Sequence, residues 1–214
     1  MIGKGVLLEC LESPKIEKVL VINRKSLGMT HPKSEEVLLS DFLNVADIKD
    51  QLEGYDACLY CMGVSAVGMN EEQYIKITYD TTKAFADILY ELNPEMIFNF
   101  ISGSGSDETE KSGTMWRRIK GKAENIVLNK GFKDAYVFRP GMIIPEKGIK
   151  SRTNWYNGIY AIMRPFFPLL KKSKNITTTT KLGQAMINAI FFPQDLKHLE
   201  NIDINALAEM RIEN

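Results

Sequence analysis

The stretch MIGKGVLLECLESPKIEKVLVINR (residues 1–24) indicates how this chain folds. Its first twelve residues place apolar side chains at helical spacing on one face, and Ser13-Pro14 ends that helix. Residues 19–22 (VLVI) then read as a strand of the kind buried in a parallel sheet. A helix followed so closely by such a strand is the second half of a β-α-β unit. We therefore expect another strand before the helix, and the sequence starts without it.

The same alternation of strands and helices continues along the chain. Further strands are expected at 37–39, 55–62, 96–101 and 135–138, with a short closing strand near 201–204. Helices are expected at 46–52, 71–92, 115–129 and 181–191. With right-handed crossovers, this order predicts an α/β protein whose doubly wound parallel sheet is covered by helices on both faces. All 214 residues are expected to form one domain.

The charged residues, cysteines and histidines of the chain exclude some classes of function. Basic and acidic residues balance at 27 each, so no overall field favours nucleic acid or an anionic membrane. Three cysteines and the lack of a secretion signal predict a reducing, cytoplasmic setting. Cys58 and Cys61 should lie on opposite faces of a strand as core residues rather than as a reactive pair. His31 and His198 lie outside any ligand pattern, so no metal site is expected.

The alternation lapses between residues 144 and 180, which we expect to be a lid or substrate-side insertion. Aromatic residues gather between 155 and 170, interrupted by Arg164, Pro165 and Pro168. These interruptions exclude a membrane-spanning helix. Three roles for the aromatic stretch remain open, namely a substrate lid, a helix in peripheral contact with a membrane, and the face of a homodimer.

Unusual polar and glycine residues follow the expected strands. Ligands of parallel α/β sheets bind at the carboxyl ends of strands, so these positions mark a candidate site. They are Asn23-Arg24, Asp41-Phe42, Cys61-Met62-Gly63, Ser102-Gly103-Ser104 and Arg139-Pro140-Gly141.

These segments together resemble a known family. The pieces that carry the resemblance are VLVINR (19–24), SDF (40–42), CMG (61–63), ISGSGS (101–106), WRRIKGKAEN (116–125) and FRPGMI (138–143). In order and spacing the chain resembles the short-chain dehydrogenase/reductase superfamily, in its atypical or extended, epimerase-like branch. The resemblance covers nearly the whole chain and implies a Rossmann-like fold that binds NAD(P).

The resemblance also implies which residues contact the cofactor. Gly3 matches the third glycine of the glycine-rich loop, where a missing side chain allows helix and strand to pack closely. Arg24 matches the position that meets the 2′-phosphate, which favours NADP over NAD, although a solvated strand end is the alternative. The remaining matches are Asp41 and Phe42 at the adenine, Met62 and Gly63 over the ribose, and Pro140 beside the nicotinamide.

The catalytic motif that the resemblance implies is incomplete. Lys120 matches the lysine of Tyr-x-x-x-Lys, and Ser102 or Ser104 matches the serine. Trp116 stands where the tyrosine is expected, and an indole N–H donates a hydrogen bond but does not release a proton near neutral pH. Tyr79, Tyr156 and Tyr160 are alternative proton donors, and a core or lid aromatic is the alternative role of Trp116.

In the fold that the chain resembles, the absent first strand lies centrally, between the strand that matches 19–22 and the one that matches the strand ending at Met62. Leaving two strand edges unpaired is costly, so three explanations stand. The two strands pair with each other, another chain supplies a strand, or the polypeptide is longer and Met1 is an internal methionine. We favour the last as a hypothesis.

Two classes of function follow. The first is an NADP-preferring oxidoreductase or epimerase-like enzyme with a small-molecule substrate. The second is a catalytically weak or inactive NADP-binding sensor or interaction module, or a truncated relative, as Trp116 and the missing loop suggest.

Overall fold

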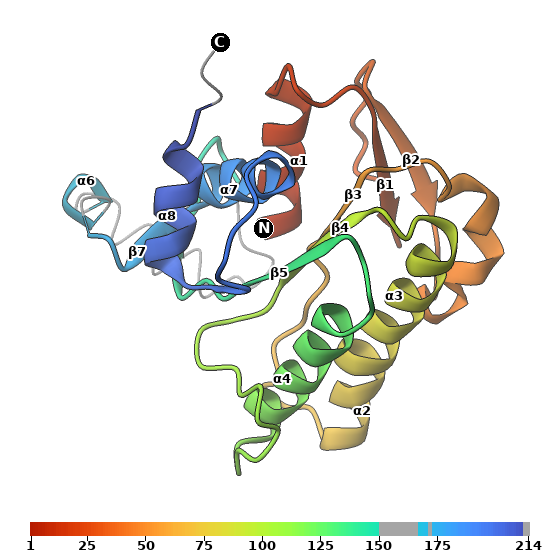
Figure 1. Ribbon diagram of the computed structural model, residues 1–214, viewed down its shortest axis with the longest axis vertical. Helices are drawn as coiled ribbons and strands as arrows, with labels where there is room; N and C mark the ends of the chain where they lie inside the picture. The colour runs from red at the N-terminus through yellow and green to blue at the C-terminus, as the bar shows by residue number, and fades with distance from the viewer. Residues whose placement is uncertain (150–166, 171–172, 212–214) are drawn as a thin grey trace.

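The computed structural model describes residues 1–149, 167–170 and 173–211. Helices lie on both sides of a layer of strands (Figure 1). One side carries α1 (Ile2–Glu12), α7 (Thr179–Phe191) and α8 (Asn201–Glu209). The other carries α2 (Glu71–Ile75), α3 (Thr81–Leu92) and α4 (Met115–Leu128). A short α6 (Phe167–Leu170) lies apart, and no described helix is long and apolar enough to cross a membrane.

All described strand pairs are parallel. The largest sheet has the order β3 (Ala57–Tyr60), β4 (Ile97–Ile101), β5 (Asp134–Phe138) and β8 (His198–Leu199). Separate pairs are formed by β1 (Val19–Asn23) with β2 (Ser34–Leu38), and by β6 (Met142–Ile144) with β7 (Ile176–Thr178). The expected Rossmann-like α/β architecture is confirmed.

The sheet is interrupted between β1 and β3. Within the described residues β1 pairs with β2 and β3 pairs with β4, and the two strands exchange no backbone hydrogen bond with each other. The explanation in which these strands pair directly is therefore wrong for this structure. Both strands nevertheless contact the same two hydrophobic cores, so they belong to one layer.

The two cores lie on opposite sides of that layer. The first core packs α3 and α4 against the strands, with Phe98 and Phe100 fully buried. The second core packs α1, α7 and α8 against them, with Phe138 fully buried. Cys58 contacts the first core and Cys61 the second, as the odd spacing predicted. All three cysteines are free.

The expected closing strand at 201–204 is wrong, because these residues begin α8. Glu200 and Asp203 form a capping box there, and Ile204, Leu207 and Ala208 bury one helical face. Apolar residues at this spacing suit a helix, and the closing strand is the short β8 just before it.

Three other elements differ in detail from expectation. The helix expected at 71–92 contains a π-helical turn, η2 (Lys76–Asp80), between α2 and α3. The helix expected at 46–52 is a 3-10 helix, η1 (Phe42–Gln51). The strand expected at 37–39 begins earlier, at Ser34.

Candidate functional site

The first turn of α1 meets the end of β3. A Cβ atom placed on Gly3 would lie 3.3 Å from the Cβ of Cys61, so glycine permits the close packing that the sequence predicted. The helix has no side-chain cap and no acidic residue in its first turn. Unpaired amides and the helix dipole at such an end favour an anion.

Arg24 and Phe42 lie together beyond β1. The guanidinium carbon of Arg24 stands 5.9 Å from the ring centroid of Phe42, and Arg24 is exposed. Among the described residues Arg24 has no ion pair. Asp41 caps η1, because its carboxylate accepts a hydrogen bond from the Leu43 amide at 3.0 Å. A free guanidinium beside an aromatic face can therefore receive a phosphate next to an adenine.

The loop after Arg24 is held by Glu36. Its carboxylate accepts hydrogen bonds from the side chains of Asn23 at 2.9 Å and Ser26 at 2.5 Å, and from the Leu27 amide at 3.0 Å. The bond from Ser26, followed by those from Asn23 and Leu27, holds the pKa of Glu36 below its usual value. The loop geometry beside Arg24 is thus fixed by the protein itself.

The turn after β3 is partly anchored. The Tyr60 hydroxyl donates a hydrogen bond to the Met62 sulfur at 3.9 Å, and Met62 packs against the first core. Gly63 is exposed, and no atom lies within 4 Å of the Cβ that a side chain there would have. This open position leaves space above the turn.

The serine turn after β4 lies beside the turn after β5. Ser102 is buried, and its hydroxyl lies 2.9 Å from the hydroxyl of Ser106. Ser104 is exposed, and its amide donates to the carbonyl of Pro140 at 3.2 Å. The Ser102 amide donates to the carbonyl of Phe138 at 2.8 Å, so both candidate serines lie beside the end of β5.

Lys120 lies half-buried on α4, and its side chain makes no hydrogen bond or ion pair with another described residue. Burial lowers its pKa to about 8, while the nearby carboxylate of Glu124 acts in the opposite direction. The side chain therefore keeps donors available for a ligand.

Trp116 stands one turn before Lys120, at the start of α4. Its ring lies 3.7 Å from the Cβ that Gly105 would have, and the Arg117 guanidinium stands 5.5 Å from the ring centroid. The indole thus borders the serine turn. Tyr79 is engaged elsewhere, since the Lys122 amine lies 4.4 Å from its ring centroid and Lys122 leaves α4 on a different side from Lys120. Tyr156 and Tyr160 lie outside the described residues.

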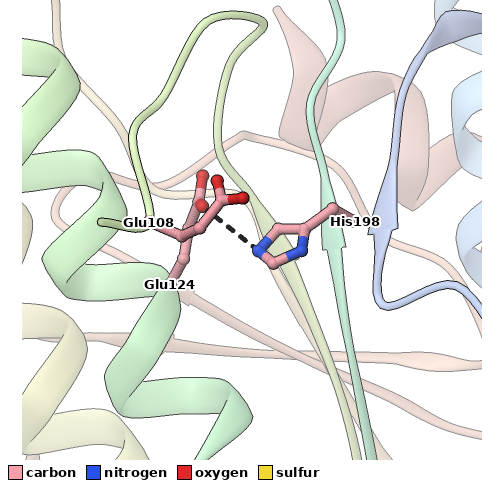
Figure 2. A group of neighbouring side chains, drawn as sticks. All are labelled: Glu108, Glu124 and His198. Atoms are coloured by element: carbon pink, nitrogen blue, oxygen red, sulfur yellow. Dashed lines mark ion pairs between the residues drawn. The ribbon is translucent and has the colours of Figure 1, made fainter. Parts of the chain in front are cut away.

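A buried charge network supports this end of the site. Glu124 is fully buried on α4 and forms an ion pair with Arg139, which also contacts Glu108 at 2.5 Å. His198 points at the same carboxylate with its Nε2 at 3.5 Å from Glu124, as Figure 2 shows. Burial would raise the pKa of Glu124, but the neighbouring polar groups of His198, Arg139 and Ser102 lower it to about 2. The network links Ser102 to the helix that carries Lys120.

Three side chains of this network, those of Glu108, Glu124 and His198, lie close enough together to be compared with a metal site. Oxygen and nitrogen atoms of Glu108, Glu124 and His198 all lie within 4.8 Å of one another, the spacing of a metal-ligand set. Arg139 bonds both carboxylates, however, so a cation there would meet an existing positive charge. The arrangement is that of an ion-pair network.

Sequence reasoning did not identify this network. Arg139 and His198 are distant from Glu124 along the chain, and only folding brings them together. One signal was available: Glu124 falls within the apolar stripe of Ile119, Ala123 and Val127 on α4, where an acid needs a buried partner.

The predicted site residues form two groups. The first group consists of Arg24, Asp41 and Phe42, and the second of Ser102, Ser104 and Pro140. Lys120 is connected to the second group through Glu124. Among the described residues, no hydrogen bond or ion pair joins the two groups. Gly3 lies in the first turn of α1, and Met62 and Gly63 lie just after β3. The ends of these two elements lie between the two groups. Most of the aromatic stretch falls in 150–166, outside the described residues, so its three proposed roles stay predictions.

Comparison with known proteins finds a relative of similar sequence. Protein HTATIP2 of Rattus norvegicus is 25% identical over 175 residues, which cover 80% of this chain and 68% of that protein. No protein-family profile matches the chain.

Solved structures share the fold at low identity. A UDP-galactose 4-epimerase matches with a TM-score of 0.62 and 15% identity, over 93% of this chain and 72% of that one. The enzyme WbmH of Bordetella bronchiseptica, in complex with NAD⁺, matches with a TM-score of 0.64 and 14% identity, over 89% and 69%. The likeness to these structures confirms the Rossmann-like fold that the resemblance to the short-chain dehydrogenase/reductase superfamily predicted.

Proposed function

We propose that this chain binds NADP(H) across the carboxyl ends of its strands and acts as an oxidoreductase or epimerase-like enzyme on a small molecule. The observation that carries the proposal is the free guanidinium of Arg24 beside the Phe42 ring. A planar guanidinium suits a phosphate, which NADP has at the adenosine ribose and NAD lacks. The NAD⁺ held by the similar fold of WbmH supports a dinucleotide in general.

The start of α1 would receive the pyrophosphate. Its first turn has no acidic side chain to repel an anion, and Gly3 keeps the helix close to Cys61 at the end of β3. Helix amides and the positive end of the dipole stabilise phosphate charge at such a point. These features fit a dinucleotide that runs from Arg24 toward the serine turn.

Lys120 and Ser102 would serve the reactive end. When bound, a nicotinamide cofactor supplies or accepts a hydride. Lys120, with a pKa of about 8, is mostly protonated at neutral pH and can hold ribose hydroxyls with its ammonium group. Ser106 gives its proton to the Gly103 carbonyl, so the proton of Ser102 is directed to Ser106, and the Ser102 oxygen can accept a hydrogen bond from a substrate hydroxyl at the edge of the sheet.

The three cysteines are free, as is usual in a reducing compartment, and we therefore propose that the protein is located in the cytoplasm.

The test is a calorimetric titration of the 214-residue protein with NADPH and with NADH. We expect tighter binding of NADPH. Arg24→Leu should weaken NADPH binding roughly 10- to 100-fold, because a charged hydrogen bond contributes about 1.5–3 kcal/mol, and should leave NADH unchanged.

Lys25→Leu is the matched control, since it removes the neighbouring exposed charge from the same loop. If both variants lose the same NADPH affinity, Arg24 acts only through the overall positive charge of the loop and not through direct contact with the phosphate. Binding of neither dinucleotide at millimolar concentration would refute the proposal.

A catalytically weak sensor is the second candidate, and Trp116 is the observation that favours it. The indole borders the serine turn but cannot supply a proton as a tyrosine does. Positioned acid catalysis contributes about 10²- to 10⁴-fold in rate. NADPH oxidation against a panel of aldehydes and ketones distinguishes the two functions: measurable turnover that is lost in Lys120→Ala favours the enzyme, and NADPH binding without turnover favours the sensor.

A further inference from the structure

An arginine with an unpaired charge lies beside the serine turn. The guanidinium of Arg117 lies 3.6 Å from the Cβ that a side chain at Gly105 would have, and 5.5 Å from the ring centroid of Trp116. Arg117 is exposed, and its side chain makes no hydrogen bond or ion pair with another described residue. A guanidinium beside an aromatic ring keeps its in-plane N–H donors free, so Arg117 can bind a ligand.

The next arginine along α4 is held by the protein, in contrast to Arg117. Arg118 donates to both carboxylate oxygens of Glu71, at 2.8 and 2.9 Å, and to the Ser112 carbonyl at 2.6 Å. The donors of Arg118 are therefore used within the fold, while those of Arg117 are available.

Acidic side chains lie near Arg117 in the loop that follows the serine turn. The Asp107 amide donates to the Arg117 carbonyl at 3.0 Å, so this loop rests against the first part of α4. Each carboxylate of the loop nevertheless has another partner: Asp107 accepts from the amides of Lys111 and Ser112, Glu108 pairs with Arg139, and Glu110 accepts from Asn125. The loop thus approaches Arg117 without supplying a counter-ion.

Arg117 is placed at the reactive end of the proposed cofactor site. It precedes Lys120 by three residues, a spacing that makes two side chains neighbours on a helix surface. On its other side, Ser104 of the serine turn is exposed and donates its amide to the Pro140 carbonyl at 3.2 Å. A substrate that reaches Lys120 and the serine turn would therefore lie close to the Arg117 guanidinium.

We propose that Arg117 binds an oxyanion group of the substrate, a carboxylate or a phosphate, and so selects anionic carbonyl compounds over neutral ones. The planar guanidinium presents parallel N–H donors to two oxygens of either group. As an assignment of substrate class, the inference rests on the proposed function. Anion binding at Arg117 can be measured without the cofactor, so the two proposals can fail separately.

The probes are two pairs of small carbonyl compounds that differ in charge. Pyruvate and pyruvamide form the carboxylate pair, and dihydroxyacetone phosphate and dihydroxyacetone form the phosphate pair. Each compound is titrated into the 214-residue protein, first alone and then with saturating NADP⁺, while NMR follows the Gly105 amide and the Arg117 Nε–H signal. We expect one of the anions to shift both signals and to bind at least about tenfold more tightly than its neutral partner, because only the anion forms a charged hydrogen bond.

Two variants test whether the guanidinium itself is responsible. Arg117→Gln should weaken binding of that anion about tenfold. Lys122→Gln removes an exposed charge five residues further along α4 and should leave the affinity unchanged. Equal binding of the charged and neutral partners, or equal losses in the two variants, would overturn the proposal.

The titrations with NADP⁺ separate a substrate contact from a cofactor contact. An anion affinity that persists with NADP⁺ bound supports the proposal, and competition between the anion and NADP⁺ would overturn it, because Arg117 would then contact the cofactor. A protein that binds no NADP⁺ would refute the proposed function, and the titrations without cofactor would still show whether Arg117 binds an anion.

Discussion

Strands β4 and β1 have similarly apolar sequences but different surroundings. Phe98, Phe100 and Ile101 of β4 are at most 5% exposed, and β4 has a hydrogen-bonded strand on each side. Every residue of β1 is half-buried, and β1 has a partner on one side only. Composition alone therefore does not bury a strand in this molecule. We call the part around β4 and β5, where both edges of each strand are paired, the closed region. We call the part around β1 and β3, where each strand is paired on one edge only, the open region.

The largest expected effect lies in the closed region, at the buried ion pair. Arg139→Leu would leave the fully buried carboxylate of Glu124 without its main partner. Breaking one side of a buried pair costs about 3–5 kcal/mol, measured as the free energy of unfolding in urea. Lys197→Leu, which breaks the more exposed pair with Asp134, is the control and should cost about 0–1 kcal/mol. Similar losses in both variants would show that the buried network does not stabilise this region.

Matched isoleucines compare the two regions directly. Ile101→Ala in β4 removes a side chain that is 5% exposed and should cost about 2–5 kcal/mol. Ile22→Ala in β1 removes a half-buried one and should cost about 1–2 kcal/mol, because less apolar surface returns to water. Chemical unfolding of both variants gives the difference. Equal losses would contradict the distinction between the regions.

Acid should weaken the closed region through Glu124. Its pKa in the folded protein is about 2, below the ordinary value of 4.5, so its stabilisation is complete above pH 4.5 and is lost as pH falls toward 2. Between pH 5 and 3 this group should account for a loss of about 2 kcal/mol in the free energy of unfolding. Urea titrations of the wild type and Glu124→Gln measure it. An unchanged slope in the variant would rule out Glu124 as the source.

The smallest effect serves as a baseline outside both regions. The Thr178 hydroxyl accepts a hydrogen bond from the Lys181 amide at 3.1 Å and caps α7. Thr178→Ala should cost about 1 kcal/mol of unfolding free energy. Thr180→Ala, two residues on, makes no cap and should cost less. A larger loss at Thr180 would indicate that the cap is not what stabilises this end of α7.

Much of the fold could be predicted from local patterns. Alternating apolar strands and amphipathic helices identified the parallel α/β order, including β4, β5, α4 and α7. The error at 201–204 arose because a short apolar run suits a strand or a helix, and the capping box of Glu200 with Asp203 decides for the helix. The π-helical turn within 71–92 has no local signal of its own.

The site was predictable only in part. Strand ends indicated Arg24, Phe42, Ser102 and Pro140, because parallel sheets gather such positions at one edge. The contacts of Arg139 with Glu108 and of His198 with Glu124 depend on pairing between distant segments, which no local pattern encodes. The roles of the indicated residues toward a cofactor stay predictions.

A crystal structure of the protein with NADP⁺ tests the central claim most directly. We expect the 2′-phosphate to contact the Arg24 guanidinium, the adenine to lie against Phe42, and the nicotinamide ribose to lie within hydrogen-bond distance of Lys120. A dinucleotide bound away from the carboxyl ends of the strands, or a 2′-phosphate that does not contact Arg24, would contradict the proposed function.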